Sequence, residues 1–74
     1  MGRLPTVTAR EMVAALKRAG FEEDEQRGSH LRMWHPERKF ITTVPIHPGD
    51  LPRPLVKAIL KQSGLSEEEF RDLL

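Results

Sequence analysis

The segment that decides the fold of this chain is Gln26-Arg27-Gly28-Ser29-His30-Leu31-Arg32-Met33-Trp34-His35. Its Gly-Ser pair is typical of a turn, and the residues that follow alternate in character as those of a strand do. Successive side chains of a strand point to opposite faces of the sheet. We therefore predict that Leu31 and Met33 face the core. His30, Arg32 and Trp34 would then share the open face.

Upstream of this segment, the sequence predicts one helix at about residues 8–19. Thr8 is a favourable N-cap, and Glu11 three residues later completes a capping box. Gly20 is well placed to end the helix. Between these signals, apolar residues recur at helical spacing, namely Ala9, Met12, Val13 and Leu16.

Residues 21–27 are predicted to form an edge strand, because they lie between a helix end and a Gly-Ser turn. The acidic run of residues 22–25 dominates this strand. Charges on an edge strand discourage unwanted pairing with other chains, so we interpret the run as a solvated edge. Beside a nucleic-acid site, the same run would repel phosphate.

Downstream, residues 30–35 and 40–44 are predicted strands, joined by a turn at residues 36–39. Two strands with so short a connection form an antiparallel hairpin. A second helix is expected to start near Pro52 and to end at Gly64, with a buried stripe formed by Leu55, Val56, Ile59 and Leu60.

A second capping box, Ser66 with Glu69, predicts a short third helix at about residues 67–73. The order α-β-β-β-α-α indicates the α+β class: a sandwich of a three-stranded antiparallel sheet with helices on one face. We expect one domain spanning residues 1–74, whose other sheet face is open to solvent or to a partner.

Composition excludes several classes of function. The chain has 74 residues and no cysteine, so it has no disulfide and no thiol nucleophile. Twelve basic residues nearly balance eleven acidic ones, so charge alone does not indicate a nucleic-acid binder. No apolar run approaches the ~20 residues that span a bilayer, and there is no signal-peptide core. We expect a cytoplasmic protein without membrane contact.

Several short segments, in this order and at this spacing, resemble the HicA family of bacterial toxins: Gly20-Phe21, Arg27-Gly28-Ser29-His30, His35-Pro36, Val44-Pro45-Ile46-His47, Asp50-Leu51-Pro52 and Ile59-Leu60-Lys61-Gln62-Ser63-Gly64-Leu65. The resemblance implies a fold like that of double-stranded RNA-binding domains. It also implies the toxin component of a type II toxin–antitoxin system, a ribosome-independent mRNA interferase neutralised by a HicB-type antitoxin. The family's catalytic histidine lies in the Gly-Ser-His turn, which implies that role for His30.

The three histidines receive different interpretations. An imidazole exchanges protons near neutral pH, so His30 can act on a ribose 2′-hydroxyl or on the leaving 5′-oxygen. From spacing alone, a surface histidine at a strand end is the simpler interpretation, and the resemblance favours catalysis. His47 lies in a predicted loop, where it is a second acid/base candidate or a locally bonded residue. His35 has core-facing parity and is predicted to be structural. The three lack metal-ligand spacing, and we predict no metal and no cofactor.

Residues around His30 are candidates for RNA binding. Arg27 and Arg32 can hold phosphates. Gly28 would permit a positive φ or a close backbone approach, and Ser29 would shape the turn or touch a phosphate. Trp34 can stack on a base or pack against HicB; alternatively it is a sheet-face aromatic partly covered by arginine side chains.

Lys57 belongs to a basic flank of the second helix, together with Arg53 and Lys61. Such a flank contacts phosphate or is simply solvated. The leading hypothesis is thus an endoribonuclease toxin whose partners are mRNA and a HicB-like antitoxin. Two alternatives remain: a non-catalytic RNA-binding module, and a degenerate toxin that only binds its antitoxin.

Overall fold

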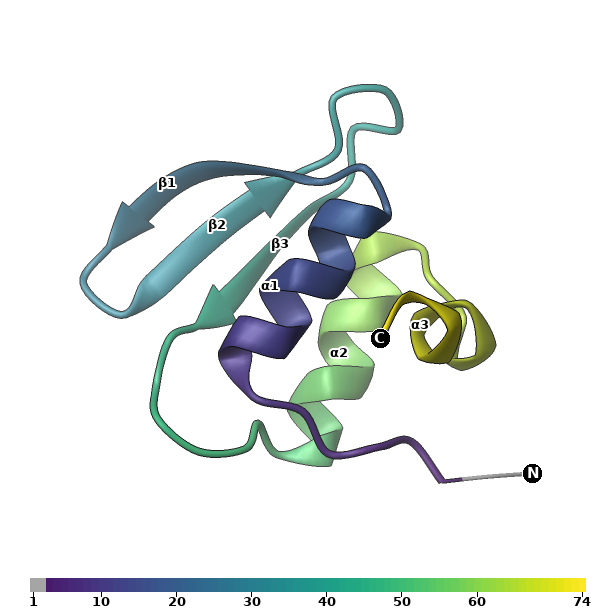
Figure 1. The fold of residues 1–74 in the computed structure, drawn as a ribbon. Helices are drawn as coiled ribbons and strands as arrows, with labels where there is room; N and C mark the ends of the chain where they lie inside the picture. The colour runs from purple at the N-terminus through teal and green to yellow at the C-terminus, as the bar shows by residue number, and fades with distance from the viewer. Residues whose placement is uncertain (1–2) are drawn as a thin grey trace.

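The computed structural model describes residues 3–74 (Figure 1). Its elements, in chain order, are α1 (Ala9–Arg18), β1 (Glu22–Arg27), β2 (His30–Trp34), β3 (Ile41–Pro45), α2 (Arg53–Ser63) and α3 (Glu67–Leu73). The strands form one antiparallel sheet in the order β1-β2-β3. Figure 1 shows α1 and α2 side by side on one face of this sheet, with α3 beyond them. The predicted α+β class and element order are confirmed.

The ends of α1 form as the capping signals predict. The Thr8 side chain accepts a hydrogen bond from the Glu11 N–H (3.1 Å), and the Thr8 N–H donates to the Glu11 carboxylate (2.9 Å). At the other end, Gly20 has a φ of 101°, which side chains rarely tolerate. This conformation lets the Phe21 N–H donate to the Leu16 carbonyl (2.9 Å), as in a Schellman motif.

The later helices also begin and end as predicted. Gly64 is left-handed and ends α2, and the Leu65 N–H donates to the Leu60 carbonyl (3.0 Å). Ser66 and Glu69 form the second capping box at the start of α3. Within residues 3–74, no helix combines the length and the apolar character that crossing a bilayer requires.

The core lies between the sheet and the helices. On β2, Leu31 and Met33 are 5% and 0% exposed, whereas His30 and Arg32 are exposed and Trp34 is half-buried. The predicted alternation of faces along β2 is therefore confirmed. The other fully or nearly fully buried apolar side chains are Leu4, Val7, Ala9, Met12, Ala15, Leu16, Phe21, Val44, Leu51, Val56, Ile59, Leu60 and Phe70.

The β2–β3 hairpin differs from the prediction by one residue at its strand ends. β2 ends at Trp34 rather than at His35, and β3 runs over Ile41–Pro45 rather than over residues 40–44. The His35 N–H still donates to the Phe40 carbonyl (2.9 Å), but Lys39 takes a left-handed φ of 64°. This turn directs the Phe40 ring onto Gly64 instead of into the sheet.

Candidate nucleic-acid interface

The β1–β2 turn presents His30 on the open face of the sheet. Gly28 adopts a φ of 58°, which allows the tight turn that the sequence predicts. His30 begins the central strand, opposite Arg27 on β1 and Pro45 on β3. Because its neighbour Leu31 faces the helices, the exposed imidazole points to the other side. An imidazole there is accessible to a ligand.

A shallow pocket of about 320 Å³ surrounds this imidazole. Its lining residues come from all three strands and are Glu25, Arg27, His30, Arg32 and Thr43. The structure thus brings together three of the predicted site residues, namely His30 and the two arginines. Glu25 and Thr43 were not predicted.

A β-bulge in β1 changes the chemistry of this pocket. Glu23 pairs with Met33 and Glu25 pairs with Arg32, so Asp24 is an extra residue in the ladder. In a bulge, two residues of one strand lie opposite a single residue of its partner. Asp24 and Glu25 therefore both lie opposite Arg32, although neighbouring residues of a regular strand would alternate between faces.

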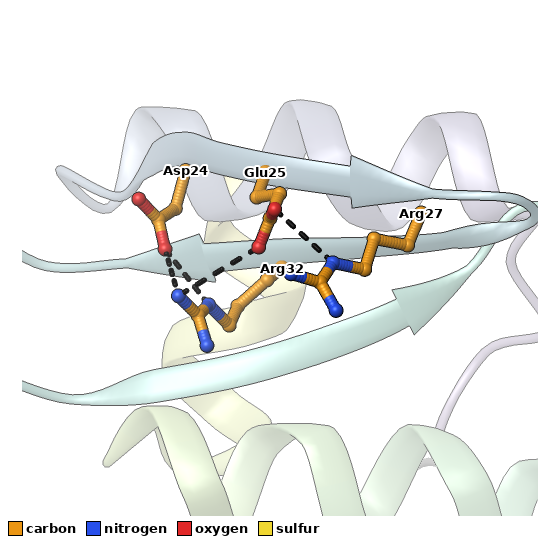
Figure 2. Close-up of polar contacts among 4 residues, drawn as sticks. All are labelled: Asp24, Glu25, Arg27 and Arg32. Carbon is orange, nitrogen blue, oxygen red and sulfur yellow. Dashed lines mark hydrogen bonds and ion pairs between the residues drawn. The ribbon is translucent and has the colours of Figure 1, made fainter.

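Both arginines of the pocket are paired with these acidic residues (Figure 2). The Asp24 carboxylate accepts from Nε of Arg32 at 2.7 Å and forms an ion pair with its Nη2 at 2.7 Å, and Glu25 lies 4.0 Å from Nη2. Glu25 also accepts from Nε of Arg27 at 3.1 Å. Figure 2 shows these four side chains on the side of the sheet away from the helices. Together they carry no net charge.

The other end of the open face is apolar. Trp34 lies opposite Glu22 on β1 and Ile41 on β3, and Ile41 is 55% exposed. Cross-strand partners share a face, so the indole and the Ile41 side chain form an exposed apolar patch. The open face therefore has two parts, the His30 pocket and the Trp34–Ile41 patch.

Histidines 35 and 47 lie in different settings. His35 is buried, its Nδ1 accepts from the N–H groups of Glu37 and Arg38 (3.2 and 3.1 Å), and its ring meets Phe21 edge-on at 5.3 Å. These contacts support its predicted structural role. His47 is exposed in the loop after β3. The preceding residue, Ile46, donates to the Ser29 carbonyl, which holds the start of this loop beside the β1–β2 turn.

Lys57 is not part of the open face. It is exposed on α2, which lies in the helical layer. Gln62 marks the side of α2 next to the sheet, because it accepts from the Thr42 hydroxyl of β3 at 2.7 Å. Lys57 lies five residues earlier, roughly 140° around the helix. The structure therefore separates Lys57 from the His30 pocket.

A second pocket, of about 600 Å³, lies between the end of α1, the β2–β3 turn and α3. Glu69 lines this pocket, and its carboxylate accepts a hydrogen bond from the Ser66 N–H at the start of α3. The hydrogen bonds with Ser66, assisted by the nearby Arg38, hold the pKa of Glu69 below its usual range. Among residues 3–74, no group of three or more His, Asp or Glu side chains is arranged to hold a metal ion.

Comparison with known proteins gives one family match. The family described as the HicA toxin of bacterial toxin–antitoxin systems matches residues 9–65. This range runs from the first residue of α1 to just beyond α2, and it includes the whole sheet and the His30 pocket. The comparison with curated proteins gives no match.

Proposed function

Because this chain belongs to the HicA family of bacterial toxins, we propose that it is a ribosome-independent mRNA interferase with His30 as general acid or base. The observation that carries this proposal is the exposed His30 imidazole in a pocket that also contains Arg27 and Arg32. RNA cleavage needs a group that transfers protons and cations that bind phosphate, and this pocket contains an imidazole beside two arginines.

The chemistry uses the substrate's own nucleophile. The ribose 2′-oxygen attacks the adjacent phosphorus, and the bond from phosphorus to the 5′-oxygen breaks. The 2′-hydroxyl loses a proton, and the leaving 5′-oxygen gains one. His30 takes the first proton or supplies the second, a role worth typically 10²–10⁴-fold in rate. His47, on the loop beside the same turn, is the candidate for the complementary role.

The other predicted residues, apart from Lys57, bind and orient RNA in this proposal. Arg27 and Arg32 hold phosphate oxygens through their N–H groups. Gly28 and Ser29 let the nucleic-acid backbone approach the turn. The half-buried Trp34 offers a ring on which an unpaired base can stack, which favours single-stranded mRNA.

The partner that neutralises the toxin is proposed to be a HicB-type antitoxin, acting in the cytoplasm. It would cover the open face or the His30 turn. The exposed Trp34–Ile41 patch supports this location, because aromatic and apolar side chains are enriched in the centres of protein interfaces.

The test compares wild type, His30→Ala and His47→Ala, each induced in cells and each purified and incubated with single-stranded RNA. We expect wild type to arrest growth and to cleave RNA, and His30→Ala to lose both. His47→Ala tests the complementary role, because it also removes one exposed imidazole near the turn. It should lower cleavage if His47 exchanges the second proton.

Each outcome has a clear meaning. Cleavage that persists in His30→Ala and vanishes in His47→Ala would move the chemistry to His47. No cleavage by the folded wild type would favour one of the two non-catalytic alternatives. Salt-sensitive RNA binding would then indicate the RNA-binding module, and its absence would indicate a toxin that only binds its antitoxin.

A further inference from the structure

The two pocket arginines already have anionic partners in their own chain. Asp24 occupies Nε and Nη2 of Arg32, and Glu25 occupies Nε of Arg27. These N–H groups are the donors that would bind phosphate oxygens. RNA can therefore use them fully only if the carboxylates move aside.

We propose that Asp24 and Glu25 act as an intramolecular competitor of RNA phosphate at the His30 pocket. This inference rests on the proposed function, because it concerns the RNA site described there. The two carboxylates set the affinity of the site for the nucleic-acid backbone. They are not a permanent block, and RNA displaces them on binding.

The exposure of the pairs makes displacement feasible. The side chains of Arg32 and Asp24 are 51% and 38% exposed, so water and salt screen their attraction. Exposed ion pairs contribute little to stability, and a phosphate can replace the carboxylate without leaving a charge buried. Both anions offer oxygens that suit the planar donors of arginine.

The bulge indicates that this arrangement is more than a solvated acidic edge. Glu23, in the same run, faces the helices and pairs with Lys17 of α1 at 2.6 Å. The extra residue at Asp24 brings a second carboxylate opposite Arg32, where a regular strand would bring one. As a result, the four charges around the pocket cancel.

A neutral pocket has a consequence for substrate choice. A strongly basic groove would bind any RNA or DNA through its phosphates. Here the favourable energy of binding phosphate is reduced by the loss of the internal pairs. Binding must then depend more on interactions with bases, for which Trp34 is available on the same face.

The experiment measures binding of a short, fluorescein-labelled, single-stranded 2′-O-methyl RNA of mixed sequence, which cannot be cleaved. The variants are Asp24→Asn, Glu25→Gln and their double substitution, in the full chain over a series of KCl concentrations. Glu23→Gln is the matched control, because it removes the same charge from the same strand on the helical side. Asn and Gln keep the shape and an oxygen acceptor.

We expect Asp24→Asn and Glu25→Gln each to bind roughly two- to fivefold more tightly than wild type at low salt, in line with the weakness of exposed pairs. The salt dependence should steepen, by about 0.7 in logarithmic slope for each further phosphate that the protein neutralises. Glu23→Gln should change both quantities less. Thermal melting of every variant checks that the fold is intact.

Two other results would refute the proposal that Asp24 and Glu25 compete with RNA phosphate. If the open-face variants bind no more tightly than Glu23→Gln, only net charge matters. If they bind more weakly than wild type, the carboxylates position the arginines instead of competing for them. If neither wild type nor any variant binds RNA, the proposed function itself fails, which separates that failure from the failure of this inference.

Discussion

Replacing Gly64 with alanine tests the packing between the end of α2 and the β2–β3 turn. Gly64 has a φ of 69°, and a Cβ added there would lie 2.4 Å from Cε2 of Phe40. The left-handed backbone alone costs about 1–2 kcal/mol for a residue with a side chain. The Phe40 ring must also move, because real Cβ atoms do not approach a ring carbon so closely.

The second contribution can be estimated from the ring surface. Phe40 is 38% exposed, so its ring can swing outward without disturbing the core. Re-exposing about 40 Å² of ring would lose about 1 kcal/mol at 25 cal/mol per Å². The total for Gly64→Ala is then about 2–3 kcal/mol. For a chain of this size, that loss lowers the melting temperature by roughly 10–20 °C.

The assay is thermal and urea unfolding of Gly64→Ala, Phe40→Ala and the double variant. In the Phe40→Ala background, Gly64→Ala should cost only its backbone part, so the two substitutions should couple by about 1 kcal/mol. Gly28→Ala is a control, because Gly28 has a φ of 58° and nothing within 4 Å of an added Cβ. Strictly additive losses, with Gly64→Ala no worse than Gly28→Ala, would refute the close packing of Phe40.

Further predictions concern the histidines, the basic flank and the last helix. His30→Ala should lower the rate of RNA cleavage by roughly 10²–10⁴-fold with little change in melting temperature. His35→Ala should instead lower the melting temperature, because His35 is buried and hydrogen-bonded. Activity assays and thermal melts on the same samples check both. Lys57→Ala should leave the cleavage rate nearly unchanged, because Lys57 lies in the helical layer; a large loss would place RNA there too. Ser66→Ala should lower the free energy of unfolding by about 1 kcal/mol. The lowered pKa of Glu69 means that its contribution to stability is present above the ordinary titration range of glutamate and is lost as the pH falls through the lower folded-state pKa. When melting temperature is measured at decreasing acidic pH, it should therefore fall less for Glu69→Gln than for wild type.

The helices could be predicted from sequence because their ends are determined locally. Each capping box needs two side chains three residues apart, and both boxes form with Thr8 and Ser66 as N-caps. Gly20 and Gly64 end helices because they supply the left-handed conformation that a Schellman motif requires. These signals depend on a few neighbouring residues, so no knowledge of the tertiary structure was needed to find them.

The candidate site could be predicted only in part, because it depends on which elements meet. The alternation along β2 places His30 and Arg32 on one face, as the sequence indicates. Thr43 enters the pocket through the pairing of β3 with β2, which fixes its position opposite Arg32. Lys57 is separated from the pocket because of the way α2 is rotated against the sheet. The spacing of the basic residues along α2 does not determine this rotation.

The contrast between β2 and β1 explains why the sequence did not place Asp24 and Glu25 beside Arg32. β2 is the central strand and pairs on both edges, so an extra residue in it would disrupt two ladders. β1 pairs only with β2, and an extra residue there disrupts one ladder. A period of two is therefore a sound guide to the faces of a central strand and a weaker guide for an edge strand. In this chain, one inserted residue on the edge strand places Asp24 against Arg32, and thereby changes the charge of the face that the central strand presents.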